Sequence, residues 1–163
     1  NRRTFDETLD TLFQQARENE TSLSILFIDV DFFKKYNDFY GHQKGDNVIS
    51  SIAKSIKNAI RHMDFVARYG GEEFVVLLPE TNAHGAYAVA SNIYKAIERL
   101  EISHEKSSVS DYITISLGIT VYQGETEINK DELLVVADQA LYRAKELGRN
   151  QIYYQSIRTI QTI

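Results

Sequence analysis

The sequence predicts a single α/β (α+β) domain in which a mixed, mainly antiparallel sheet is covered by helices, in a ferredoxin-like arrangement. The chain has 163 residues, 43% of them hydrophobic, which is enough to bury one core. Its expected elements follow the order α-β-α-α-β-β-α-β-α-β. A β-hairpin stands between β-α units, which is typical of the split βαβ topology.

The first part of the chain carries the first strand and three expected helices. Apolar residues recur at helical spacing over residues 4–18, which indicates an amphipathic helix. Leu23–Val30 is a continuous apolar run and is expected to be a buried strand. A short helix over Phe32–Tyr40 should end at Gly41, and Asp46 should cap the next helix.

A hairpin is predicted in the middle of the chain. Its strands are Phe65–Tyr69 and Phe74–Leu78, and Pro79 is expected to stop the second strand. Gly70-Gly71 should form a tight turn, because glycine tolerates positive φ.

The last third completes the alternation of helices and strands. Ala83–Leu100 is expected to be a helix, and the polar residues 101–111 a loop. Tyr112–Tyr122 alternates between apolar and other residues, as a strand does. A helix over Asp131–Leu147 and a short strand over Gln151–Tyr154 should follow.

Composition and charge limit the classes of function that this chain can have. The net charge is -5 and the pI about 5.4, which argues against a binding surface for a nucleic acid polymer. The absence of cysteine excludes disulfides and thiolate chemistry, and no apolar run approaches the length of a membrane span. No signal peptide opens the sequence, so a cytoplasmic domain without membrane contact is expected. Binding of a small phosphorylated ligand is still compatible with this charge, because it needs only a local cluster of basic residues.

Two acidic residues distant in the sequence are expected to meet. The first strand and the hairpin are neighbours in the predicted sheet, so Asp29 at the strand end should lie beside Glu72 in the turn. A charged Asp in an apolar strand costs several kcal/mol of desolvation unless something pairs with it. Mg²⁺ binds carboxylates together with substrate phosphates, and two such ions can clamp a phosphoryl transfer.

The neighbouring charged residues leave alternatives open. Asp31 either points to the same side as Asp29 or caps the helix that starts at Phe32. Glu72 and Glu73 should face opposite sides of the strand, so only one is a direct ligand. Lys34 and Lys35 open a helix whose N-terminus can bind an anion.

Further basic residues stand near the C-terminus. Lys145 and Arg149 are four apart on one helical face, either for an anion or as a solvent-facing helix end that its dipole favours.

Three segments together resemble a known family. FIDVDFFKKYNDFYGHQKGD, RHMDFVARYGGEEF and ADQALYRAKELGRN are similar, in order and spacing, to the motifs of GGDEF-domain diguanylate cyclases, here in a GGEEF form. The resemblance implies a palm-like sheet related to that of adenylyl cyclases. It also implies that two GTP molecules condense to cyclic di-GMP with release of two pyrophosphates, in a homodimer.

The resemblance also implies roles for individual residues. Asp29, the Val30 carbonyl and Glu72 would bind two Mg²⁺ ions in each half-site, with Mn²⁺ as the alternative ion. Glu72 would accept the proton of the attacking 3′-hydroxyl, and Lys34 would stabilise charge that develops in phosphoryl transfer. The substrate-binding positions would be Asn37, His42, Asp46, Phe32, Phe33, Gly70, Gly71, Lys145 and Arg149, with Asn37 and Asp46 facing guanine.

An RxxD pair, Arg61 and Asp64, fits the family's inhibitory site, which binds the product cyclic di-GMP. The alternative is an ion pair at a helix end. A second arginine often joins this site from the next helix, where this chain has Asn92 and, further along, Arg99.

Two alternative functions remain open at this stage. One is a non-catalytic cyclic di-GMP receptor that uses Arg61 and Asp64, and the other is a cyclase that accepts a different base, such as ATP. The opening NRR resembles the end of a longer motif that introduces these domains, so residues 1–163 are expected to be one catalytic domain excised from a larger regulatory protein.

Overall fold

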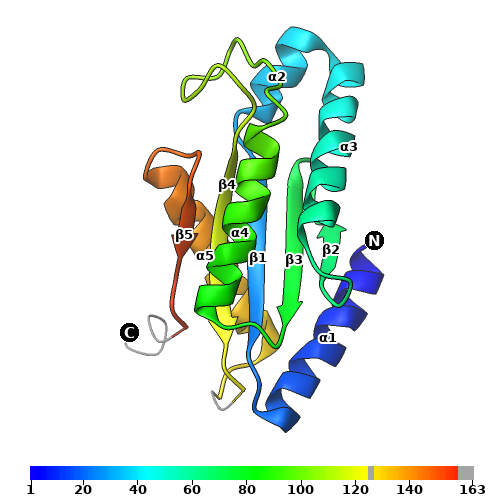
Figure 1. Cartoon of the computed structure of the whole chain (residues 1–163), viewed down its shortest axis with the longest axis vertical. Coiled ribbons are helices and arrows are strands. Elements are labelled where there is room, and N and C mark those ends of the chain that lie inside the picture. The colour runs from blue at the N-terminus through cyan, green and yellow to red at the C-terminus, as the bar shows by residue number, and fades with distance from the viewer. Residues whose placement is uncertain (125–126, 158–163) are drawn as a thin grey trace.

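The computed structural model describes residues 1–124 and 127–157, and Figure 1 shows its elements. The helices of this part are α1 (Arg2–Asn19), α2 (Phe33–Tyr40), α3 (His42–Ala59), α4 (Ala83–Glu98) and α5 (Lys130–Glu146). The strands are β1 (Leu23–Val30), β2 (Phe65–Arg68), β3 (Glu73–Pro79), β4 (Ile115–Tyr122) and β5 (Ile152–Tyr154). This is the predicted order, and residues 158–163 of the expected single domain lie outside the described part.

The strands form one mixed sheet in the order β2-β3-β1-β4-β5. Strand β1 pairs antiparallel with both β3 and β4, β2 pairs antiparallel with β3, and β5 runs parallel to β4. Helices α3 and α4 cover one face, while α1 and α5 cover the other (Figure 1). The predicted fold class is therefore confirmed, including the central position of β1 beside the hairpin.

Both faces of the two central strands are buried. Alternate residues of β1 pack with α3 and α4 on one side, and the remaining ones pack with α1 and α5 on the other. Gly118 of β4 lies under α5, where a Cβ atom would be 2.2 Å from the backbone nitrogen of Leu141. The missing side chain thus lets the α5 backbone approach the sheet closely.

Two local predictions were wrong. Helix α3 begins at His42, so Asp46 lies inside the helix and does not cap it. Gly41 separates α2 from α3. Its φ is 94°, a conformation that glycine adopts readily, and this lets the chain turn between the two helices. Gly70 and Gly71 are absent from the residues with positive φ. Strand β3 ends at Pro79, as predicted.

No helix in the described ranges combines the length and the apolar character that crossing a membrane requires.

Replacing Gly118 with alanine should destabilise the fold. The new methyl group would overlap the backbone of α5, and overpacking of this kind costs about 1–3 kcal/mol. Urea unfolding measures the loss. Gly71→Ala is the matched control, because a Cβ there meets no heavy atom within 4 Å. Equal stabilities of the two variants would contradict the close approach of the α5 backbone to Gly118.

Candidate active site

The candidate site begins where the end of β1 meets the β2–β3 turn. Asp29 stands opposite Glu73 in the antiparallel register, and the Val30 amide donates a hydrogen bond to the Glu72 carbonyl over 3.2 Å. The predicted meeting of Asp29 with the turn is confirmed. The pairing of β1 with β3 therefore brings Glu72 and Glu73 to the strand end that carries Asp29.

Asp29 is a buried carboxylate with one free oxygen. The residue is 8% exposed, and its Oδ2 forms an ion pair with Lys145. Its Oδ1 is buried and has no hydrogen-bond partner among the described residues. Burial raises the pKa of this carboxyl, although Lys145 acts in the opposite direction. An additional cation would therefore find an oxygen that needs a partner.

Glu72 and Glu73 add negative charge to the same region. Burial raises the pKa of both side chains, the nearby Asp29 raises it further, and Lys145 partly offsets this. The described residues contain no cluster of three or more His, Cys, Asp or Glu side chains arranged to hold a metal. Asp29 and Glu72 would therefore need oxygen atoms from the backbone and from a phosphate to complete a Mg²⁺ site, which is how this ion is commonly bound.

Helix α5 and the turn after it supply the positive charge. The Lys145 side chain is only 27% exposed and contacts Asp29, so it is not the solvent-facing alternative. Arg149 adopts a positive φ of 63° beyond the helix, and its guanidinium carbon lies 4.7 Å from the centre of the Phe32 ring. Lys145 and Arg149 both lower the pKa of Glu72, which places them near the acidic residues.

Asp31 does not cap the next helix, but it lies on the same side as Asp29, since it contacts Ser116, the β4 partner of Asp29, and raises the pKa of Asp29. Its carboxylate is buried and accepts hydrogen bonds from Thr114, Ser116 and the amide of Asn150. The residue that precedes α2 is Phe32, at φ 53°, and no side chain caps this helix. The sequence signal for these hydrogen bonds was a pair of hydroxyl residues, Thr114 and Ser116, on either side of the first residue of β4.

The residues at the start of α2 differ in their contacts and in their exposure to solvent. The Phe32 carbonyl accepts a hydrogen bond from Nε2 of His104 over 2.9 Å, a partner that sequence reasoning missed. Phe33 is buried in the core. Lys34 is 88% exposed and pairs with Asp38 at 3.1 Å, whereas Lys35 lies 5.2 Å from the Phe32 ring centre. The amides of the first helical turn have no partners within the helix and can receive an anion.

Asn37 and Gly45 meet at the corner between α2 and α3. The Asn37 Oδ1 atom is buried and has no hydrogen-bond partner among the described residues. A Cβ at Gly45 would stand 1.8 Å from this oxygen, so glycine makes room for the amide. Asp46 follows Gly45 directly, and it and His42 are exposed. The corner thus gathers polar groups that a bound molecule could satisfy.

The turn that carries Glu72 is held by backbone contacts. The Glu73 carbonyl accepts from the amides of Tyr69 at 2.7 Å and Gly70 at 3.3 Å. Arg68, which sequence reasoning missed, donates to the carbonyls of Gly70 and Gly71. A Cβ at Gly70 would approach Glu73 Oε1 to 2.8 Å, so Gly70 gives space to this carboxylate rather than a positive φ.

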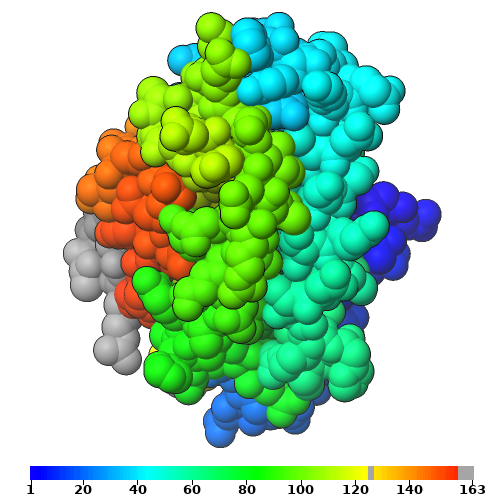
Figure 2. Space-filling model, turned by 45° about the horizontal axis from the view of Figure 1, so that its top comes forward, coloured from blue at the N-terminus to red at the C-terminus, as the bar shows by residue number. Residues whose placement is uncertain are grey.

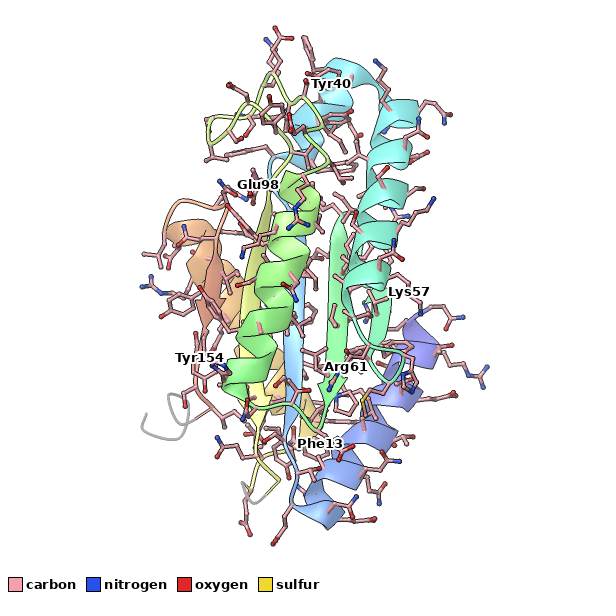
Figure 3. The ribbon with its side chains drawn as sticks, viewed as in Figure 1. Phe13, Tyr40, Lys57, Arg61, Glu98 and Tyr154 are labelled. Atoms are coloured by element: carbon pink, nitrogen blue, oxygen red, sulfur yellow. The ribbon has the colours of Figure 1, made fainter. Side chains whose placement is uncertain are left out.

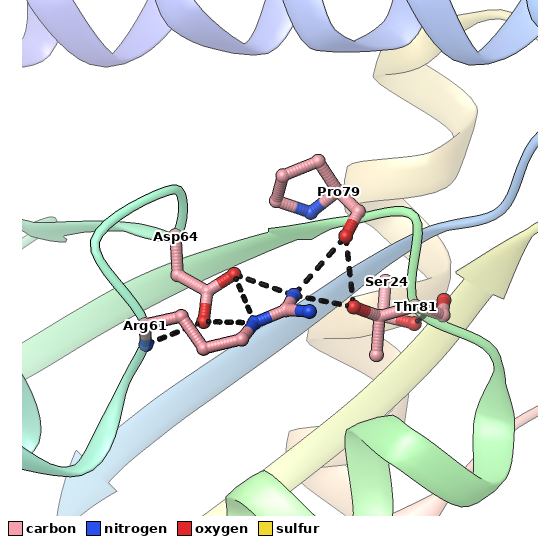
Figure 4. A network of polar contacts seen from close by, with 5 residues as sticks. All are labelled: Ser24, Arg61, Asp64, Pro79 and Thr81. Carbon is pink, nitrogen blue, oxygen red and sulfur yellow. Dashed lines mark hydrogen bonds and ion pairs between the residues drawn. The ribbon is translucent and has the colours of Figure 1, made fainter.

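Arg61 and Asp64 form a separate network at the other end of β3. Asp64 is buried, and both its oxygens accept from the Arg61 side chain, which also donates to Pro79 and Thr81 (Figure 4). The Arg61 side chain nevertheless stays 45% exposed. Figure 3 places Arg61 and Glu98 toward opposite ends of α4, so Arg99, which follows Glu98, lies far from Arg61.

A family model described as "Diguanylate cyclase, GGDEF domain" matches residues 1–151. The chain belongs to the GGDEF family. Among curated relatives, Diguanylate cyclase A of Treponema denticola is 44% identical over 146 residues, which are 90% of this chain and 38% of that protein. The response regulator PleD of Caulobacter vibrioides is 37% identical over 93% of this chain and 33% of its own length. This GGDEF domain thus spans about a third to two-fifths of these two relatives.

Solved structures support the same assignment. The GGDEF domain of DgcB from Caulobacter crescentus in complex with c-di-GMP superposes with a TM-score of 0.84 at 33% identity, covering 94% of this chain and 90% of that one. The active GGEEF domain of a diguanylate cyclase from Vibrio cholerae gives a TM-score of 0.77 at 31% identity, covering 88% and 89%. The predicted family resemblance and palm-like fold are confirmed.

Glu72→Gln should stabilise this GGDEF domain slightly when no divalent cation is present. The pKa of Glu72 is raised on folding, so its ionised form opposes folding at neutral pH, and the amide removes the repulsion from Asp29. We expect a rise in Tm of roughly 1–3 °C at pH 7.

The gain in Tm should disappear at a pH low enough to protonate glutamate in both the folded and unfolded chain. Glu18→Gln, on the exposed side of α1, is the control for loss of a charge as such. A lower Tm for Glu72→Gln at pH 7 would show that the carboxylate is stabilising instead.

Proposed function

We propose that this domain is a diguanylate cyclase that condenses two GTP molecules into cyclic di-GMP and releases pyrophosphate. The observation that carries the proposal is the buried Oδ1 of Asp29, which has no hydrogen-bond partner in the described part of the chain. Glu72, Lys145 and Arg149 lie close by. Such a site joins oxygen ligands for a hard cation to positive groups for phosphates. The relatives named as diguanylate cyclases support the same activity.

Asp29, the Val30 carbonyl and Glu72 are the groups that would hold two Mg²⁺ ions, or Mn²⁺ in their place. When bound, these ions would polarise the phosphates and lower the pKa of the attacking hydroxyl. Glu72, whose pKa is raised by burial and by Asp29, is suited to accept the proton of the 3′-hydroxyl. The oxygen then bonds to the α-phosphorus of the other GTP as the bond to pyrophosphate breaks.

The remaining residues would bind and orient the nucleotide. The Asn37 amide and the Asp46 carboxylate can meet the edge of guanine, and the carboxylate can accept from the base N1–H and N2–H groups. The amides of Phe32 and Phe33, the Gly70-Gly71 turn, Lys145 and Arg149 would contact the phosphates, with His42 at the rim. Lys34 would have to exchange its contact with Asp38 for a phosphate before it could stabilise developing charge.

Two domains would have to meet for the reaction. One such half-site holds one GTP, whereas each new bond joins the 3′-hydroxyl of one GTP to the α-phosphate of the other. Two copies facing each other in antiparallel orientation satisfy this requirement. The substrate and this chemistry also fit the expected cytoplasmic location.

Incubating the concentrated domain with GTP and Mg²⁺ should yield cyclic di-GMP, identified by mass spectrometry. The specific activity should rise with protein concentration, because the reaction needs two domains. Glu72→Gln should lose at least about 10²-fold in rate, since it removes a ligand and a base together. ATP in place of GTP tests the other base choice. The proposal would be overturned if the domain formed a cyclic product from ATP but not from GTP, or if Glu72→Gln turned over GTP at a near-normal rate.

Arg61 and Asp64 are proposed as an inhibitory site for cyclic di-GMP. The exposed part of the Arg61 guanidinium can meet a phosphate or a guanine edge, while Asp64 fixes its orientation. Because this network lies at the end of β3 away from Glu73, a ligand there would act by holding two domains apart. The same contacts would serve a non-catalytic receptor, and the activity measurement above decides between these functions.

Arg61→Ala should abolish inhibition by added cyclic di-GMP and leave the initial rate unchanged. It should also lower the Tm, because it leaves the buried Asp64 carboxylate without its charged partner. Thr81→Val is the matched control, since it removes one partner of Arg61 while keeping the guanidinium. Calorimetry that detects no cyclic di-GMP binding to the unsubstituted domain would reduce the network to a structural ion pair.

A further inference from the structure

Asp31 is a buried carboxylate that the proposed mechanism does not use. It follows β1 directly and is 1% exposed, yet it carries an ionisable group into the interior. Its contacts come from two segments that are distant in the sequence. One is the start of β4 with the residues before it, and the other is the turn between α5 and β5.

Each oxygen of Asp31 has a defined set of partners. Oδ1 accepts from Ser116 Oγ at 2.6 Å, and Oδ2 accepts from Thr114 Oγ1 at 2.8 Å and from the Asn150 amide at 2.9 Å. The Asp31 amide in turn donates to the Thr114 carbonyl over 2.9 Å. The carboxylate is therefore locked in one orientation by donors on two sides.

The same carboxylate faces Arg149. The Nη1 atom of Arg149 lies 3.8 Å from Asp31 Oδ1, too far for a hydrogen bond but close enough for an ion pair. The Phe32 ring lies on the guanidinium from another direction, 4.7 Å from Cζ to the ring centre. No hydrogen bond from the Arg149 side chain is present within residues 1–124 and 127–157. Its N–H groups are thus oriented by charge and stacking while they stay available to a ligand.

The backbone of this turn also depends on Asp31. Gly148, Arg149 and Asn150 all have positive φ, at 124°, 63° and 51°. Two of them are not glycine, and the left-handed region costs such residues free energy. The hydrogen bond from the Asn150 amide to Asp31 is one of the contacts that offset this cost, and the Arg149 amide donates to Ala144 at 3.0 Å.

We propose that Asp31 is a positioning residue that holds Arg149 for the triphosphate of the nucleotide. This inference rests on the proposed function, because it takes GTP as the ligand. Asp31 does not touch the substrate itself. Its charge keeps the guanidinium beside Phe32, and its hydrogen bonds fix the turn on which Arg149 stands.

Asp31→Asn removes the negative charge that faces Arg149, while the asparagine side chain can keep the hydrogen bonds of Asp31. The asparagine oxygen can take the place of Oδ2 and accept from Thr114 and Asn150. Its amide nitrogen can take the place of Oδ1 and donate to the Ser116 hydroxyl, which can rotate to accept. Ser116→Ala is the matched control, because it removes one hydrogen bond and keeps the charge that faces Arg149.

The test measures the Kd of GTP and of guanosine by calorimetry, with Ca²⁺ in place of Mg²⁺ to slow turnover. Asp31→Asn should raise the Kd of GTP about three- to tenfold, as expected for the loss of one favourable charge contact. It should leave the Kd of guanosine unchanged, since guanosine has no phosphate. Ser116→Ala should lower the Tm and change neither Kd.

A double-mutant cycle shows whether Asp31 acts through Arg149. The variant with both Asp31→Asn and Arg149→Ala should bind GTP as Arg149→Ala alone does. Additive effects, or equal losses for GTP and guanosine, would overturn the inference. If Asp31→Asn does not fold, rotation of the Arg149 guanidinium about its Nε–Cζ bond, measured by NMR in the unsubstituted domain, decides instead. Free rotation overturns the proposal, and slow rotation that persists in Ser116→Ala supports it.

The two proposals fail in different ways. An unsubstituted domain that does not bind GTP would contradict the proposed cyclase. A domain that binds and condenses GTP, yet shows additive effects of Asp31→Asn and Arg149→Ala, would contradict only the role of Asp31.

Discussion

The structure depends on the burial of negative charge where β1 pairs with β3. This pairing brings Asp29 beside Glu72 and Glu73. Burial raises the pKa of all three carboxyls, and repulsion from Asp29 raises the pKa of both glutamates further. Such an arrangement survives only where positive groups are close. Lys145 pairs directly with Asp29, whereas Oδ1 of Asp29 has no hydrogen-bond partner among the described residues.

The positive groups reach this region because α5 lies close to the sheet. Gly118 presents no side chain to the helix, so the α5 backbone approaches β4, and the last turn of α5 places Lys145 against Asp29. Packing and electrostatics are therefore linked at this point. A larger residue at position 118 would move the helix, and with it the charge that balances Asp29.

The sequence was sufficient to predict the fold and the meeting of Asp29 with Glu72, because strand periodicity and the position of the hairpin determine which strands are neighbours. It was not sufficient for Asp31, whose donors Ser116 and Asn150 come from segments that only the folded chain brings together. Asp46 was assigned as a helix cap because its residue type suits one, whereas Gly41 starts the helix earlier. Contacts such as His104 with Phe32 arise from a loop with no periodic pattern to interpret.

The central position of β1 has a consequence for folding. Its partners β3 and β4 both lie far along the chain, so neither edge of this apolar strand is paired until those segments have been made. Non-local pairing of this kind slows folding and leaves strand edges exposed to other chains. The cluster around Asp31 is complete only when residues 149 and 150 have joined it. We therefore expect the candidate site to form only late in folding.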